Sequence, residues 1–289
     1  MQWAEISIET TANAQEAVSD VMTENGCSGT MIQHAAAGVV VTGYFPVDDR
    51  IESRLLSIKS SIKELSKFGL DAGSGELTVQ YVKDEEWAEA WKQSFHTIRA
   101  GHRVVIKPSW EKYEPEIGDI VLEMDPGMAF GTGYHPTTQL CLRLLEKYMR
   151  SRKVVVDFGT GSGILALAAA RLKASLVIAF DQDEVAVQAA RENVIRNGLE
   201  DVIEVHRADG PDFINLQADL VTANLLAEIV MAHASDFARL LRTGGMLIAS
   251  GLVKERALEV EQSLRNEGFD IVETPTEDEW VAIVARKSG

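Results

Sequence analysis

The sequence predicts an α/β protein of two domains, in which a small α+β domain precedes a larger domain built on a mostly parallel sheet. Three observations support this prediction. From residue 153 onward, strand-like and helix-like segments alternate regularly. The last two strand-like segments have no helix between them, and the segments before residue 84 follow a different order. Hydrophobic residues make up 46% of the 289 residues, which is enough for two cores.

The first domain is expected over residues 1–83. The stretch "WAEISIET" alternates apolar and polar residues like a strand, and Gly26 and Gly69 each end an amphipathic, helix-like segment. We expect strands at 3–10, 38–45 and 75–82, a further short strand near 29–35, and helices at 13–26 and 50–69. This order is typical of a ferredoxin-like α+β domain, in which two helices cover one face of an antiparallel sheet.

Residues 84–100 are predicted to form a helix that connects the two domains. Trp87, Trp91 and Phe95 follow one another at every fourth position, which places their rings on one face of a helix. We therefore expect this face to pack against one of the domains.

The second domain is expected over residues 101–289. Its strands are rich in Val, Ile, Leu and Ala, which is typical of a parallel sheet covered by helices on both faces. The final two strands imply an antiparallel hairpin at one edge, whereas a dinucleotide-binding domain stays parallel. We expect strands at 102–110, 119–127, 153–158, 175–181, 202–206, 218–224, 245–251, 269–274 and 279–287, and helices at 163–174, 183–198, 226–241 and 254–268.

The net charge and the cysteine content limit which partners the protein can have. Lys and Arg total 28 against 44 Asp and Glu, a formal net charge of −16, which disfavours phosphate backbones and favours a basic macromolecule. Cys27 and Cys141 are too few and too far apart for a disulfide framework or a thiolate metal site, and no metal is expected. The N-terminal segment lacks the pattern of an export signal, and no apolar run approaches the roughly 20 residues that span a bilayer. These features predict a cytoplasmic protein with no membrane partner and no direct nucleic-acid binding.

A glycine-rich loop follows the strand at 153–158 and indicates a ligand site. Its three glycines, Gly159, Gly161 and Gly163, are spaced G-x-G-x-G, and Ile164 stands where the dinucleotide fingerprint has its third glycine. Asp157 precedes the loop, and a carboxylate there would repel a pyrophosphate but would suit an ammonium group. S-adenosylmethionine carries an ammonium and a sulfonium and has no phosphate, so it fits this loop. The alternative is a tight strand–helix turn that binds no ligand.

Polar residues end three further strands of the second domain. Asp181 is placed to hold both hydroxyls of a ribose, and Asp209 is placed to accept a hydrogen bond from an adenine amino group. Asn224 is the candidate catalytic residue, because its Oδ1 atom can accept a hydrogen bond from a substrate N–H and leave the nitrogen lone pair free. The alternatives are turn residues for the two acids and a helix N-cap for Asn224. Asp183 is expected to cap the helix that follows it.

A second motif, "DPGMAFGTGYHPTTQLCL", runs from Asp125 to Leu142 just upstream of the glycine loop. Together with "DFGTGSGILALAAARLKA", "DQDEVAVQAARENV" and "ANLLAEI", it closely resembles the bacterial ribosomal protein L11 methyltransferase family, over essentially the whole chain. The resemblance implies a Rossmann-like class I methyltransferase domain, with substrate recognition by the small N-terminal domain. Its implied reaction is S-adenosylmethionine-dependent N-methylation of lysine side-chain amines and the N-terminal amine of ribosomal protein L11, up to the trimethyl state.

Matched motif by motif, the resemblance places cofactor contacts on Thr138, Gly159, Asp181 and Asn224, with Phe130 as a further wall of the pocket. The loop departs from the family in having Thr160 where cysteine is common in relatives, and we expect this side chain to face the turn.

The implied methyl transfer needs a neutral amine, held here by Asn224 and losing its proton to water. His135 is the best-placed candidate for a general base, although its pattern favours a structural loop histidine. The main alternative is an RNA or DNA base methyltransferase on the same fold, which would need a basic groove. A nicotinamide oxidoreductase is disfavoured by the glycine spacing, and a non-catalytic binding module stays open.

Overall fold

The computed structural model describes residues 2–27, 30–35, 38–68, 70–83, 95–125, 131 and 133–289. The chain divides into two compact units, Met1–Phe95 and His96–Gly289, and each is described by itself. Within the described residues, no helix has both the length and the apolar character needed to cross a membrane.

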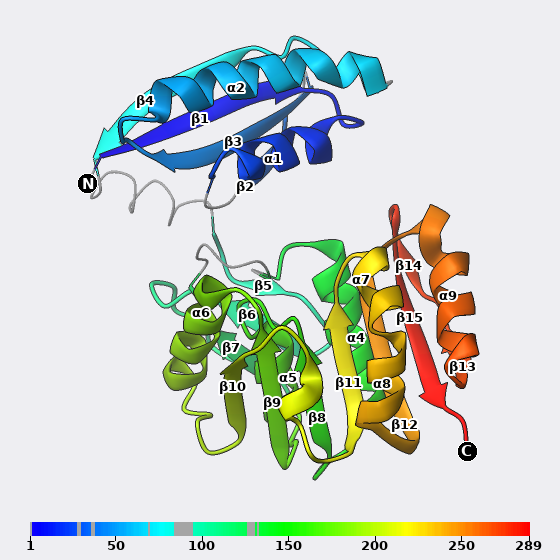
Figure 1. Ribbon diagram of the computed structural model, residues 1–289. Coiled ribbons are helices and arrows are strands. Elements are labelled where there is room, and N and C mark those ends of the chain that lie inside the picture. The colour runs from blue at the N-terminus through cyan, green and yellow to red at the C-terminus, as the bar shows by residue number, and fades with distance from the viewer. Residues whose placement is uncertain are drawn as a thin grey trace. The chain divides into compact units, whose positions relative to one another are not determined.

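The first unit is a ferredoxin-like α+β sandwich, as predicted. Its antiparallel sheet has the order β2-β3-β1-β4, and the strand expected near 29–35 is present as β2. Figure 1 shows α1 and α2 on one face of this sheet. On that face Ala4, Ile6 and Ile8 of β1 are fully buried. The elements are β1 (Gln2–Thr10), α1 (Gln15–Glu24), β2 (Thr30–Ala35), β3 (Gly38–Pro46), α2 (Ile51–Glu64), the 3-10 helix η1 (Leu65–Phe68) and β4 (Leu77–Lys83).

The predicted connecting helix is only partly covered by the structure. Residues 84–94 lie outside the described residues, and with them Trp87 and Trp91. The end of the prediction is wrong, because β5 (Ile98–Arg99) is a strand that pairs with β6. Strand β6 (Val104–Lys107) also pairs in parallel with β7 (Ile120–Glu123), so these strands form a small sheet of their own.

The main sheet of the second unit has the order β10-β9-β8-β11-β12-β15-β13, with β14 paired to β15. The strands from β10 to β12 are parallel, while β15 runs antiparallel to both β12 and β13. This confirms the predicted parallel sheet with an antiparallel terminal hairpin (Figure 1). Its strands are β8 (Val154–Phe158), β9 (Leu176–Asp181), β10 (Ile203–Arg207), β11 (Ala218–Asn224), β12 (Leu241–Val253), β13 (Phe269–Glu273), β14 (Thr276–Glu277) and β15 (Trp280–Lys287).

Helices cover both faces of the main sheet and bury a separate apolar core on each. Side chains of α4, α5 and α6 pack in one core, and side chains of α7, α8 and α9 pack in the other. The single helix predicted at 226–241 is divided into α7 and α8 at His233, whose ring binds Asp236 and packs against Phe158. The helices are α4 (Pro136–Tyr148), α5 (Ile164–Arg171), α6 (Glu184–Arg196), α7 (Ala227–Ala232), α8 (Ala234–Leu240) and α9 (Ala257–Asn266), with 3-10 turns η2 (Pro211–Phe213) and η3 (Lys254–Arg256).

Candidate active site

The carboxyl ends of the parallel strands form the candidate active site. Strand β8 lies between β9 and β11, so the order of the strands along the chain reverses at β8. Ligands of open α/β sheets bind at such a switch point. The loop after β8, the last residues of β9 and β11, and the start of α4 all contribute to this edge.

The glycine loop has a backbone that only glycine adopts without strain. Gly159, Gly161 and Gly163 have φ values of 70°, 54° and 84°, which lie in the left-handed region. A Cβ atom on Gly159 would lie 2.5 Å from the Cδ2 atom of Leu225. The N–H groups of Gly159 and Thr160 both donate to the carbonyl of Phe180, at 3.0 Å and 2.9 Å, which fixes the loop on the end of β9.

Asp157 points into the interior of this loop, where it is 1% exposed. Its carboxylate accepts hydrogen bonds from the hydroxyls of Thr160 (2.7 Å) and Thr222 (2.6 Å), and from the N–H of Ala166 at the start of α5. Burial raises the pKa of Asp157, the three donors oppose that rise, and the nearby Asp181 adds to it. The structure therefore gives Asp157 the role of holding the loop and capping α5, rather than facing a ligand.

Thr160, the residue that departs from the family pattern, donates its hydroxyl to Asp157. Its side chain therefore faces the turn, as predicted. The glycine loop itself carries no positive side chain, because no Lys or Arg occurs between Asp157 and Gly163. With Asp157 and Asp181 close together, the local potential favours a cation over a phosphate.

Asp181 ends β9 with a half-buried carboxylate. It accepts hydrogen bonds from the N–H groups of Gly161 and Asp183, both at 3.0 Å, and each bond uses a different oxygen. Asp183 in turn accepts from the N–H of Val185 at 2.9 Å, which confirms its predicted role as the N-cap of α6. Each Asp181 oxygen retains a lone pair with which to accept from a hydroxyl of a ligand.

Asp209 is an exposed residue just beyond β10. The N–H of the preceding residue, Ala208, donates to the carbonyl of Asp181 at 3.0 Å, so Asp209 lies beside the end of β9. The structure thus brings these two acids to the same side of the site.

Asn224 at the end of β11 meets the first turn of α4. Its Nδ2 atom donates to the Oγ1 atom of Thr138 at 3.4 Å, and Thr138 is fully buried. Its Oδ1 atom is buried, and within the described residues it accepts no hydrogen bond. A buried acceptor without a partner costs about 1–3 kcal/mol, so this oxygen is suited to a donor on a ligand. Asn224 is not the N-cap of α7, because that position is Leu226.

His135 is the N-cap of α4 and precedes Pro136 in the first turn. Its Nδ1 atom accepts from the N–H and the hydroxyl of Thr137, at 3.3 Å and 2.7 Å, and its ring packs edge-on against Trp280. Burial lowers the pKa of His135, and the charge of Glu279 partly opposes this. The lone pair of Nδ1 is thus engaged in capping, which supports the structural interpretation of this histidine.

The segment before α4 is tied directly to the glycine loop. The Ser162 hydroxyl donates to the carbonyl of Gly131 at 2.7 Å, and the Nδ2 atom of Asn193 donates to the carbonyl of Ser162 at 2.9 Å. Phe130, the predicted pocket wall, lies outside the described residues.

Sequence reasoning missed Thr222 and Ser162 as parts of the site. Thr222 lies two residues before Asn224 on β11, so both side chains point to the same face of the strand. It also stands opposite Asp157 in the register of β8 and β11. The period of a strand could therefore have identified Thr222, whereas the contact of Ser162 with Gly131 has no local signal.

Comparisons with known proteins agree over the length of the chain. A family model described as ribosomal protein L11 methyltransferase (PrmA) matches residues 2–288. A ribosomal protein L11 methyltransferase of Anoxybacillus flavithermus is 40% identical over an alignment of 311 positions, which covers 99% of this chain and 100% of the relative. One from Brevibacillus brevis is 43% identical over an alignment of 315 positions, which covers 99% of this chain and 100% of the relative. The crystal structure of a ribosomal protein L11 methylase from Lactobacillus delbrueckii subsp. bulgaricus matches with a TM-score of 0.64 at 33% identity, covering 68% of this chain and 100% of that one.

Proposed function

Because the chain belongs to the ribosomal protein L11 methyltransferase family, we propose that it transfers methyl groups from S-adenosylmethionine to amines of ribosomal protein L11. The acceptors are lysine side-chain amines and the N-terminal amine, methylated up to the trimethyl state. The relatives are matched over their full length, so the two-unit architecture as a whole supports the same activity. The unit Met1–Phe95 serves substrate recognition, and the unit His96–Gly289 carries the chemistry in the cytoplasm, where ribosomes form.

The residues at the carboxyl edge of the sheet fit S-adenosylmethionine. The Asp181 carboxylate would accept from the ribose hydroxyls, Asp209 beside it would accept from the adenine amino group, and the backbone of Gly159 and Gly161 would allow close approach. Thr138 and Asn224 close the site from the side of α4. When bound, the cofactor supplies a methyl group on a positively charged sulfur, which becomes a neutral thioether when the methyl group leaves.

The observation that carries the proposal is the buried Oδ1 atom of Asn224, which has no partner within the described residues. This oxygen would accept a hydrogen bond from an N–H of the substrate amine and would leave the nitrogen lone pair free of the protein. A lysine amine has a reference pKa of about 10.4, so its neutral form must be favoured by loss of water and by a nearby positive charge. His135 caps α4 with its Nδ1 atom, and water is therefore our proposed acceptor for the proton of the amine.

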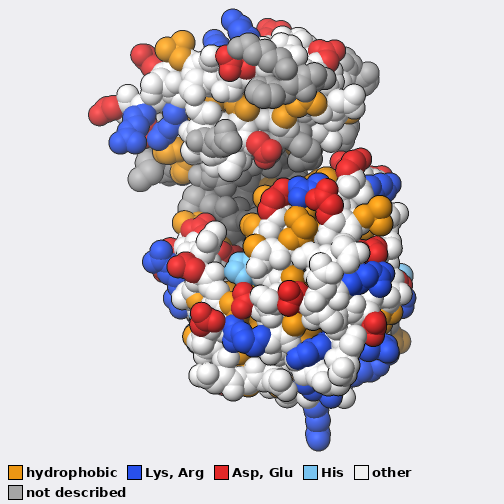
Figure 2. Space-filling view, turned by 45° about the vertical axis from the view of Figure 1, so that its right-hand side comes forward, with side chains coloured by type: hydrophobic (Ala, Val, Ile, Leu, Met, Phe, Trp, Pro, Cys, Tyr) orange, Lys and Arg blue, Asp and Glu red, His pale blue; other side chains and the backbone are white. Residues whose placement is uncertain are grey.

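The alternative, a methyltransferase for RNA or DNA bases, is not favoured. The formal net charge is −16, and binding to nucleic acid requires a basic surface. On the face shown in Figure 2, Lys and Arg side chains of the described residues are scattered among Asp and Glu side chains.

The test is transfer of labelled methyl groups to purified large-subunit proteins and to ribosomal RNA, with wild type and Asp181→Ala. Loss of two charge-assisted hydrogen bonds to the ribose weakens cofactor binding by about 3 kcal/mol, or roughly 10²-fold in Kd. Asp183→Ala is the matched control, because Asp183 caps α6 and we expect its Kd for S-adenosylmethionine to equal that of wild type. Labelling of L11 that depends on Asp181 supports the proposal, and labelling of RNA in its place contradicts it.

A further inference from the structure

The second unit begins with two residues, His96 and Thr97, that are held from two sides. The Tyr134 hydroxyl accepts from the N–H of His96 at 2.8 Å and donates to the carbonyl of the same residue at 2.6 Å. The Glu111 carboxylate accepts from the N–H and the hydroxyl of Thr97, both at 2.6 Å, and binds the Nδ1 atom of His96 at 2.8 Å. We call these four residues, His96, Thr97, Glu111 and Tyr134, the junction latch.

The hydrogen bonds of the junction latch are all retained at neutral pH. Hydrogen bonds from Thr97 and His96 lower the pKa of Glu111, so its carboxylate is ionised. Burial raises the pKa of Tyr134, so its hydroxyl keeps the proton that it donates. Both sides of the latch therefore retain their full set of hydrogen bonds.

The main chain that follows Tyr134 continues directly into α4, whose first turn borders the candidate active site. The next residue, His135, caps α4, and the Nε2 atom of Gln139 lies 3.3 Å from the carbonyls of both Gly133 and Tyr134. In the first turn of the same helix, the Oγ1 atom of Thr138 accepts from the Nδ2 atom of Asn224. A short series of contacts thus runs from the backbone of His96 to the side-chain amide of Asn224, which we propose to hold the substrate amine.

We propose that Tyr134 is a positioning residue that couples the binding of the protein substrate to the cofactor and amine site. The inference rests on the proposed function, in which residues before His96 recognise the protein substrate. The chain from that unit enters the second unit at His96, and the hydroxyl of Tyr134 is bonded to both main-chain groups there. Binding of the protein substrate by the first unit is therefore transmitted through His96 and the Tyr134 hydroxyl to the first turn of α4.

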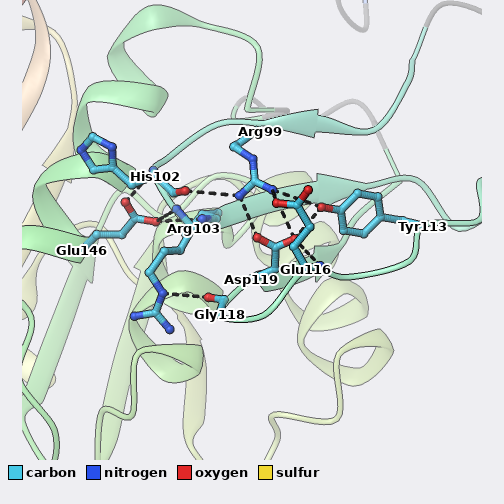
Figure 3. Close-up of polar contacts among 9 residues, drawn as sticks. Arg99, His102, Arg103, Tyr113, Glu116, Gly118, Asp119 and Glu146 are labelled. Atoms are coloured by element: carbon cyan, nitrogen blue, oxygen red, sulfur yellow. Dashed lines mark hydrogen bonds and ion pairs between the residues drawn. The ribbon is translucent and has the colours of Figure 1, made fainter.

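The folding of this region does not depend on Tyr134, because it is anchored independently elsewhere. Glu146, near the end of α4, accepts from the N–H groups of His102, Arg103 and Val104 at 2.7, 2.7 and 2.8 Å, and its contacts with the first two are drawn in Figure 3. In the same view Arg99 binds Asp119 at 2.7 Å, and Tyr113 donates to Asp119 as well. Hydrogen bonds from Arg99 and Tyr113 lower the pKa of Asp119 to about 2, so this network is also ionised at neutral pH. A variant that loses only the Tyr134 hydroxyl is thus expected to fold.

The test measures the coupling between two ligands by calorimetry. The Kd of S-adenosylhomocysteine, the unreactive product, is measured for the full chain alone and with saturating ribosomal protein L11. We expect L11 to tighten this Kd by about fivefold or more in wild type, which is the usual range for coupled sites. In Tyr134→Phe and in Glu111→Gln the tightening falls below about twofold, while the Kd without L11 changes little. Tyr148→Phe is the matched control, because its hydroxyl binds Glu273 at the far end of α4, and it retains the wild-type coupling.

The outcomes separate this inference from the proposed function. If wild type binds L11 and shows coupling that Tyr134→Phe retains, the inference is wrong and the proposed function stands. The absence of coupling in a wild type that binds L11 also overturns the inference. If wild type neither binds nor methylates L11, the proposed function fails and the inference fails with it.

Discussion

Replacement of Thr222 by valine removes one hydroxyl from the interior of the glycine loop and tests how Asp157 is held. Thr222 is 0% exposed and Asp157 is 1% exposed, so water cannot replace the 2.6 Å hydrogen bond between them. A hydrogen bond to a charged group contributes about 1.5–3 kcal/mol, and valine has nearly the shape of threonine. We therefore expect Thr222→Val to lower the free energy of unfolding at pH 7 by about 2 kcal/mol.

The pH dependence of this loss follows from the pKa of Asp157. Burial raises this pKa above its ordinary value of 3.8, so the native carboxyl binds its proton more tightly than the unfolded one. Its contribution to stability therefore declines as the pH rises above 3.8, and the hydroxyl of Thr222 limits the decline. Near pH 4 the valine variant loses only a bond to a neutral acid, about 1 kcal/mol.

The assay is urea unfolding of wild type, Thr222→Val and Thr222→Ser at both pH values. Serine keeps the hydroxyl, and we expect it to recover most of the stability that valine loses. An equal loss at both pH values, or a larger loss near pH 4, would refute the reasoning that an ionised Asp157 is held by this hydroxyl.

Three further substitutions test other parts of the site. Gly159→Ala places a Cβ atom 2.5 Å from Leu225 Cδ2 at a φ of 70°, so we expect a loss of at least about 1–2 kcal/mol and weaker S-adenosylmethionine binding, measured by thermal unfolding with and without the cofactor. Burial lowers the pKa of His135, so its contribution to stability is present above the unfolded pKa of 6.5 and is lost as the pH falls through the native pKa. His135→Asn keeps an N-cap but removes this titration. We therefore expect a smaller decline in the free energy of unfolding between pH 7 and pH 5 for the variant than for wild type. Glu146→Gln replaces a carboxylate that accepts from three N–H groups, and we expect urea unfolding to show a loss of about 1–3 kcal/mol, whereas an unchanged midpoint would contradict the assigned anchor role.

The architecture of the second unit could be predicted because its strands are buried on both faces. The apolar run from Val154 to Val156 identifies β8, and β11 occupies the predicted residues 218–224. Local rules also sufficed for Asp183, whose position before a helix predicts an N-cap.

The features that escaped prediction depend on contacts between distant residues. Ile98 and Arg99 continue a helical pattern in the sequence, but pairing with β6 makes them a strand. The bond between Tyr134 and His96 joins residues 38 positions apart and leaves no periodic signal. For Asp157, the sequence predicts a carboxylate that faces an ammonium group, but it does not show that two threonine hydroxyls bury this carboxylate inside the loop.

The most direct test of the central claim is the intact mass of ribosomal protein L11 after incubation with S-adenosylmethionine and either wild type or Asn224→Ala. At saturating cofactor, we expect wild type to add methyl groups to L11. The variant should react slower by about 10²-fold, because the amine loses the oxygen that positions it. Methylation of L11 by Asn224→Ala at the wild-type rate would contradict the account, since the amine would then be positioned elsewhere.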